Sequence, residues 1–323
     1  MPRIATLICA VSLLFSQGIA VAQGVWQPTK PIRLIVPYAA GGAADVLVRI
    51  VVEPLRQVLG QPIMIDNKGG AGGIIGTDAG AKAPPDGYTW IIGADPAFTI
   101  NPHLSSVPYD PVKSFVPVSL VALQPLVLIA NNALPIASIA DLVKLAKASP
   151  GKYTIASSGS GSSGHLAAEL LKSAAAIDLV HVPYKGQAPA LVDVVGGQVD
   201  MTFSSVGSAN AYIADGRLRA LGTTGPQRFE GLANVPTFAE AGYPLVEMRA
   251  WLGILVPAGT PAQVVDRVSA AVTEVLAQPD VRQRLVQFGY EPVGGAPSLL
   301  AQKIENDNRI FGKLVRERNI RAE

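Results

Sequence analysis

The chain is poor in cysteine and in charged residues. Its only cysteine is Cys9, close to the N-terminus, so nearly all of the 323 residues lie in a stretch without a thiol. That excludes a disulfide-stapled domain and thiolate catalysis. Charged residues make up 15% of the chain, and the formal net charge is only +2. Without a strongly basic field, we do not expect the protein to bind nucleic acid.

The chain also lacks the usual motifs of metal sites and hydrolases. His103, His165 and His181 stand apart in the sequence, with no H-E-x-x-H pattern and no cysteine partner. We therefore predict no metal and no cofactor. No G-x-S-x-G motif surrounds Ser158 or Ser160, so the exposed nucleophile of an α/β-hydrolase is missing. His165 is expected to pack or to donate a hydrogen bond, and the protein is not expected to be an enzyme.

No apolar run is long enough to predict a membrane span. The first 22 residues combine Arg3, a short apolar run and the small residues Ala20 and Ala22. That run is shorter than the roughly 20 residues needed to cross a bilayer, and A-x-A is typical of a secretory cleavage site. We predict a signal peptide over residues 1–22, cleaved after Ala22.

Short apolar runs alternate with helical patterns along the rest of the chain. This order predicts parallel sheets covered by helices, and the length suggests two domains. Pro54 is expected to kink or shorten the first helix. Residues 115–130, interrupted by Pro117 and Pro125, predict buried strands joined by a turn. The expected strands are residues 32–36, 63–65, 88–93, 126–130, 153–156, 179–182, 199–204, 218–223 and 251–256, and the expected helices are residues 47–59, 74–82, 139–148, 163–175 and 188–195, with two more closing the chain over 264–276 and 297–318.

Two strand–glycine–helix units stand out. One runs from Arg33 to Asp45 through Gly41-Gly42, and the other runs from Tyr153 to His165 through a glycine- and serine-rich turn. Such turns direct free backbone N–H groups at the start of a helix toward an anion. A tight turn with no ligand explains Gly41-Gly42 equally well, and Asp45 has a second explanation as a residue that favours the helix dipole.

The second unit also matches the dinucleotide motif. Residues 159–164 fit G-x-G-x-x-G after a strand and before a helix. The motif further requires an acidic residue at the end of the next strand, whereas that strand ends in Val182-Pro183-Tyr184-Lys185. We therefore favour a small carboxylate, bound by serine hydroxyls and helix amides, over a dinucleotide.

Several ordered blocks resemble one family. The chain is similar over nearly its whole mature length to the Bug-type periplasmic solute receptors of tripartite tricarboxylate transport systems. The blocks that carry the resemblance are residues 30–45, 67–73, 84–88, 101–104, 108–111, 157–166, 182–186, 196–200 and 235–242.

The resemblance implies a fold and a function. We expect an α/β protein of the two-lobed Venus flytrap type, each lobe a mostly parallel sheet flanked by helices, with the chain crossing twice. Lobe 1 would comprise residues 23–123 and 247–323, and lobe 2 residues 124–246. The protein would be a periplasmic monomer that captures a small organic carboxylate between the lobes and delivers it to an inner-membrane permease. Presentation of the ligand to a membrane sensor kinase is the alternative.

The resemblance also implies site residues. The ligand carboxylate would lie between the two glycine loops, and the far side of the pocket would follow the third, sixth and seventh strands. The expected ligand-binding residues are Tyr38, Ala39, Ala40, Gly41, Gly42, Asp45, Ala94, Asp95, Ser157, Ser158, Gly159, Gly161, Ser162, His165, Tyr184, Lys185, Phe203 and Ser204.

The chain departs from the family pattern at Asp95. Family members often have small hydroxyl residues and glycine at positions 95–98, whereas this chain has Asp95-Pro96-Ala97-Phe98. A carboxylate there would repel a second ligand carboxylate and attract an amine or hydroxyl donor. We therefore expect a monocarboxylate with a polar donor or an aromatic end rather than citrate.

Overall fold

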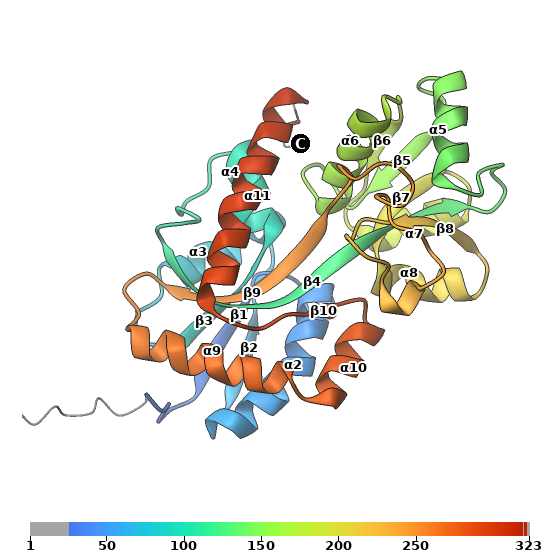
Figure 1. The fold of residues 1–323 in the computed structure, drawn as a ribbon. Helices are drawn as coiled ribbons and strands as arrows, with labels where there is room; N and C mark the ends of the chain where they lie inside the picture. Colours follow the sequence, from blue (N-terminus) through green and yellow to red (C-terminus); the bar gives the residue numbers. More distant parts are fainter. Residues whose placement is uncertain (1–25, 319, 322–323) are drawn as a thin grey trace, which may run out of the picture.

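The computed structural model describes residues 26–318 and 320–321, and the predicted signal peptide lies outside them. The chain forms two lobes, and the long strands β4 and β9 run between them (Figure 1). The two-lobed α/β architecture with a double crossing confirms the fold class expected from the sequence. No helix among the described residues is long and apolar enough to span a bilayer.

The first crossing divides the elements into two groups. Lobe 1 begins with β1 (Ile32–Val36), α2 (Ala43–Leu59), β2 (Ile63–Asn67), the 3₁₀ turn η1 (Ala71–Gly73), α3 (Ile74–Ala81), β3 (Thr89–Ala94), the π-helical turn η2 (Pro96–Ile100), α4 (Asn101–Leu104) and β4 (Phe115–Asn131). Lobe 2 then adds α5 (Ile139–Ala148), β5 (Thr154–Ser157), α6 (Ser163–Ala175), β6 (Val180–Pro183), α7 (Gln187–Val195), β7 (Met201–Ser205), α8 (Val206–Ala214), β8 (Leu218–Thr223) and the 3₁₀ turn η3 (Glu230–Leu232). The chain returns through β9 (Arg249–Pro257) and finishes with α9 (Ala262–Leu276), α10 (Pro279–Gln287), β10 (Glu291–Pro292) and α11 (Pro297–Glu317).

The directions of the strands determine which edges of the two sheets face each other. The strand order is β2-β1-β3-β9-β4-β7-β5-β6, with β8 and β10 also paired to β4. In lobe 1, β1–β3 are parallel to one another and β4 runs with them, since β9 is antiparallel to both β3 and β4. In lobe 2, β5–β7 are parallel and β4 runs against them. The carboxyl ends of the parallel strands in each lobe therefore face the other lobe, which is where open α/β sheets bind ligands.

Each lobe has its own hydrophobic core. In lobe 1, α2 packs with α9 on one face of the sheet through residues such as Leu47, Ile50 and Val268. On the opposite face, α11 contributes Leu300 and Ile304 to a cluster built around β3 and β9. Lobe 2 is organised in the same way, with α6 covering one face and α7 and α8 the other. Burial of apolar surface therefore holds each lobe together, and Ile100 of η2 with Phe311 and Leu314 of α11 extends the lobe 2 cluster into lobe 1, so apolar packing also joins the lobes.

The structure corrects three expectations about single elements. Residues 115–131 form one continuous strand rather than strands joined by a turn. Bulges in its pairing with β9 follow Pro117 and Leu120, and Pro125 lies at the end of that pairing, just before β4 joins β7. Proline is tolerated at such positions because no regular ladder hydrogen bond is lost.

The other two corrections concern helices. Pro54 does not shorten α2, which continues to Leu59 and ends at Gly60 in the left-handed conformation, with φ of 67°. The helices α8 and α10 were not expected, so three helices rather than two close the chain. The sequence also missed the four-residue helix α4; α8 and α10 have nine residues each, and α10 buries only Val281 and Leu285, so its apolar periodicity is weak.

Candidate functional site

The loop between β1 and α2 is held by a buried carboxylate. Gly41 adopts φ of 80°, and Gly42 is the N-cap of α2. The Gly41 N–H donates to Asp45 Oδ2 at 2.8 Å, and Asp45, only 2% exposed, also accepts from Arg49 Nε at 2.8 Å and from Asn67 Nδ2 at 3.1 Å. Burial alone would raise the pKa of Asp45, but these hydrogen bonds lower it below its usual value. Asp45 is thus an ionised brace beneath the loop.

The backbone amides in the first turn of α2 remain available for hydrogen bonding. The N–H groups of Ala43 and Ala44 have no hydrogen-bond partner among the residues that the structure describes, as expected for the first turn of a helix. Ala39, Ala40 and Gly42 are exposed on the same loop. The arrangement presents positive partial charge to the space outside the loop.

The loop between β5 and α6 repeats this geometry in lobe 2. Gly161 has φ of 74°, and the N-cap Ser162 accepts from the His165 N–H at 3.3 Å. The Gly161 N–H donates to His165 Nδ1 at 3.1 Å, so this nitrogen is unprotonated. The amides of Ser163 and Gly164 have no partner within the described chain. His165 therefore accepts a hydrogen bond at Nδ1, where the sequence suggested packing or donation.

A second histidine supports the first. The rings of His165 and His181 stack with centroids 3.8 Å apart and planes 4° apart. His181 Nε2 lies 2.7 Å from Ser157 Oγ, at the end of β5. Burial lowers the pKa of His165 to about 4, and electrostatic interactions with His181 and Lys172 lower it in the same direction. The imidazole is consequently neutral near pH 7 and adds no charge beneath the lobe 2 loop.

The segment of residues 95–104 lies between the two loops. A Cβ on Gly161 would lie 2.2 Å from Leu104 Cδ1 and 3.7 Å from Ile100 Cγ2, so this lobe 1 segment packs directly on the lobe 2 loop. On its other side, Asn101 Nδ2 donates to the Gly72 carbonyl. A Cβ on the neighbouring Gly73 would meet Tyr38 Oη at 3.1 Å. Both helix starts thus border a common lobe 1 surface.

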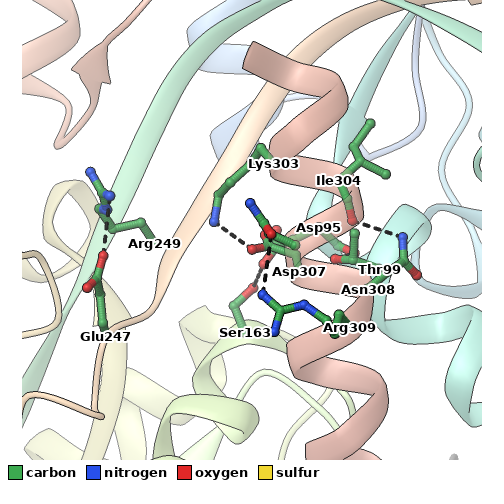
Figure 2. A network of polar contacts seen from close by, with 11 residues as sticks. Asp95, Thr99, Ser163, Glu247, Arg249, Lys303, Ile304, Asp307, Asn308 and Arg309 are labelled. Atoms are coloured by element: carbon green, nitrogen blue, oxygen red, sulfur yellow. Dashed lines mark hydrogen bonds and ion pairs between the residues drawn. The ribbon is translucent and has the colours of Figure 1, made fainter. Parts of the chain in front are cut away.

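Asp95 lies at the point where the lobes meet (Figure 2). Its side chain is 2% exposed, and its Oδ2 accepts a hydrogen bond of 2.7 Å from Ser163 Oγ, on the first residue of α6. Burial raises the pKa of Asp95 to about 7, and the charge of Asp307 on α11 adds to this, while Ser163 and Lys303 lower it. The sequence interpretation assumed an ionised carboxylate facing a ligand, whereas this carboxyl faces Ser163 and is partly protonated near neutral pH.

The remaining expected residues follow the edge of lobe 2. Tyr184 is half-buried beside Gly159 and donates its hydroxyl to Asp193 Oδ2 at 2.7 Å, and Lys185 is exposed next to it. The side chains of Phe203 and Ser204 are buried, with Phe203 packed on Phe238. The other members of the expected set lie in these loops or strand ends: Ala94 closes β3, Ser157 closes β5, and Ser158 is half-buried beside it.

Four contributing residues were not on the expected list. Arg49, Asn67 and His181 hold the two loops from behind, and Ser163 connects α6 to Asp95. The i, i+4 spacing of Asp45 and Arg49 could have revealed that pair. The other three depend on contacts between segments distant in sequence.

Three surface cavities lie away from these loops. One of 840 Å³ is bordered by α8, η3 and α10, one of 590 Å³ lies between α9 and the start of α11, and one of 440 Å³ lies beside α2 and β2. Within the described ranges, no group of three His, Cys, Asp or Glu side chains is placed to hold a metal ion.

Comparison with known proteins gives consistent matches. The family model described as tripartite tricarboxylate transporter family receptor matches residues 47–320. The chain is 36% identical to protein BugT of Bordetella pertussis, over 90% of each chain. It superposes on Rpa4515 of Rhodopseudomonas palustris, solved with adipate, with a TM-score of 0.83 and 34% identity over 92% of this chain and 99% of the other. MatC of the same organism, solved with malate, gives a TM-score of 0.78 and 32% identity over 89% and 99%.

Proposed function

Because this chain belongs to the tripartite tricarboxylate transporter receptor family, of Bug type, we propose that it captures a small carboxylate between its lobes and delivers it to an inner-membrane permease. The family consists of periplasmic substrate-binding receptors, and two solved relatives hold adipate and malate. The role does not require a bond to be broken, so the protein is proposed to be a receptor and not an enzyme. Residues 1–22 would direct its export and be removed.

The observation that carries the proposal is the pair of matched loops at facing sheet edges. In each, a left-handed glycine precedes a helix whose first amides lack partners among the described residues: Ala43 and Ala44 in lobe 1, Ser163 and Gly164 in lobe 2. Two helix starts aimed at a shared space favour an anion that both can bind. Neither loop adds a net negative charge, because Arg49 pairs with Asp45 and His165 is neutral.

These contacts suggest different roles for the expected site residues. We assign the ligand carboxylate to the backbone of residues 38–44 and 158–164, with the exposed Lys185 as a further source of positive charge. Asp45, His165 and Ser157 would position the loops, since each is buried and hydrogen-bonded to them. Closure over the ligand would exclude water and strengthen the amide contacts.

Replacing the N-cap Gly42 with aspartate tests the site. Gly42 has φ of −74° and ψ of 170°, which aspartate adopts freely, and aspartate is a favoured N-cap. A Cβ there would lie 3.2 Å from the Ala39 carbonyl oxygen, a tight contact that needs only a small shift. We expect Gly42→Asp to fold with a melting temperature near that of wild type but to weaken carboxylate binding at least tenfold, because the new charge repels the ligand.

The matched control makes the same change at another helix. Ala296 is the exposed N-cap of α11, with φ of −63° and ψ of 148° and no side-chain cap. Isothermal titration with adipate, malate and a panel of mono- and dicarboxylic acids would compare Gly42→Asp, Ala296→Asp and wild type. Equal affinity in all three would overturn the placement of the site, and no binding of any organic acid to wild type would overturn the receptor proposal.

A further inference from the structure

The contact between Asp95 and Ser163 joins side chains of the two lobes. Asp95 follows β3 in lobe 1, and Ser163 begins α6 in lobe 2, 68 residues later in the chain. Their hydrogen bond of 2.7 Å does not involve either connecting strand, β4 or β9. Any movement that separates the lobes at this edge has to break it. The bond therefore belongs to one arrangement of the lobes and not to the fold of either lobe alone.

The acceptor of this bond is buried and its donor is half-buried. Asp95 is 2% exposed, and Leu104 and Ile100 pack on Gly161, two residues before Ser163. Loss of the bond is costly because the carboxyl remains buried without its donor. From lobe 1, Asp95 is backed by Asp307 and Lys303 of α11, whose side chains form an ion pair of 2.8 Å (Figure 2). The acceptor is thus held in place by its own lobe.

Asp95 also lies close to both ligand loops. Ser163 is the residue whose own amide, with that of Gly164, is free at the start of α6. On the lobe 1 side, the Tyr38 hydroxyl is buried and has no partner within the described residues; burial raises its pKa, and the charge of Asp95 raises it further. One carboxyl therefore stands between the two loops that we assign to the ligand.

We infer that the side chains of Asp95 and Ser163 form an interlobe pair that positions the start of α6 against lobe 1, and that this hydrogen bond raises ligand affinity without a side-chain contact to the ligand. This rests on the proposed receptor function. Because the bond forms only when the lobes meet, its free energy favours the closed arrangement, and a ligand that binds that arrangement gains affinity by the same factor. A purely structural bond within one lobe would instead change unfolding and leave affinity unchanged.

Removing the hydroxyl and restoring it tests the pair. Ser163→Ala should weaken adipate or malate binding, whichever binds wild type, by about tenfold, while the melting temperature of the ligand-free protein stays within a few degrees of wild type. Ser163→Thr keeps the hydroxyl and should recover most of the affinity. Ser208→Ala, which removes a hydroxyl hydrogen-bonded to Ser205 at the start of α8 in the same lobe, is the matched control and should bind as wild type.

A double-mutant cycle separates the pair from two independent effects. Asp95→Asn retains an oxygen that can accept from Ser163, so it should lose less affinity than Asp95→Ala. Once Asp95 is alanine, adding Ser163→Ala should cost less than twofold. Fully additive losses, or a change of less than twofold in Ser163→Ala, would overturn the inference.

A measurement of closure without ligand keeps this test independent of the receptor proposal. With Cys9→Ser as background, fluorophores on Gln302→Cys in α11 and Ala140→Cys in α5 report the distance between lobes, since both positions are exposed. Ser163→Ala should shift the ligand-free population toward longer distances, and Ser163→Thr should not. An unchanged distribution would overturn the interlobe role even if carboxylates bind, and a shifted one would support that role even if none of the acids tested binds.

Discussion

The β1–α2 and β5–α6 loops have the same backbone geometry but use opposite chemistry to hold it. In both, a glycine amide donates to the side chain four residues later, which is Asp45 in lobe 1 and His165 in lobe 2. One helical turn further on, lobe 1 has Arg49, bonded to Asp45, whereas lobe 2 has Glu169, bonded to Lys172. A carboxylate is stable beside an arginine, whereas a neutral imidazole accepts the glycine hydrogen bond without adding a charge.

This difference indicates what the two loops have in common as parts of the proposed binding site. Each needs a buried acceptor for the left-handed glycine, yet a net negative charge beneath either loop would repel an anionic ligand. Lobe 1 meets both conditions with an ion pair, and lobe 2 meets them with an uncharged ring stacked on His181. The supporting chemistry therefore differs, while the electrostatic result is the same.

The largest expected effect is a difference in stability between alanine substitutions at Gly41 and at Gly161. Gly161→Ala combines a φ of 74° with a Cβ only 2.2 Å from Leu104 Cδ1, whereas a Cβ on Gly41, with φ of 80°, would meet nothing within 4 Å. Gly41→Ala should cost about 1–2 kcal/mol for the left-handed backbone, and Gly161→Ala should cost more, because the Leu104 side chain must also move. Urea unfolding measures both. Adding Leu104→Ala should recover part of the Gly161→Ala loss, and equal losses for the two alanine variants would contradict the packing difference.

The second prediction uses pH to separate the two acceptors. Folding lowers the pKa of His165 from 6.5 to about 4, so the unfolded chain binds more protons between these values. Its contribution to stability is therefore complete above pH 6.5 and is lost as pH falls toward 4, by about 2 kcal/mol at pH 4.5. The lowered pKa of Asp45 acts in the same sense but only at more acidic pH. In His165→Asn, which keeps a neutral acceptor, the dependence on pH between 6.5 and 4.5 should be smaller by this amount. An identical profile in both proteins would show that His165 does not titrate as its burial implies.

The sequence predicts the outline of both loops better than their supports. Apolar periodicity and the glycine clusters placed both loops between a strand and a helix, because these signals are local. The sequence was less informative where local signals conflict with packing. Pro117 and Pro125 suggested a break in β4, but pairing with β9 and β7 keeps the strand continuous.

The supports depend on contacts that no local pattern contains. Asp95 was singled out as an unusual residue, but its partner Ser163 and the nearby Asp307 are distant in sequence and come together only through the fold. The role of His165 as an acceptor becomes visible only when the two loops are aligned, with Gly41 on Gly161 and Asp45 on His165. Comparing the sequences of the two halves of the chain would thus have revealed the role of His165 but not the pairing of Asp95 with Ser163.

The smallest expected effect concerns the positive charge of Arg49, which pairs with Asp45 beneath the lobe 1 loop. Arg49 is 57% exposed, so Arg49→Gln should leave the stability almost unchanged, since Asp45 keeps its bonds from Gly41 and Asn67. The uncompensated carboxylate should nevertheless weaken carboxylate binding by about two- to threefold, and more at low salt, where screening is weaker. Arg56→Gln is the control, because Arg56 pairs with the exposed Glu53 farther along α2 and should not affect affinity. If Arg49→Gln binds as tightly as Arg56→Gln at low salt, then the charge of Asp45 is not sensed at the site.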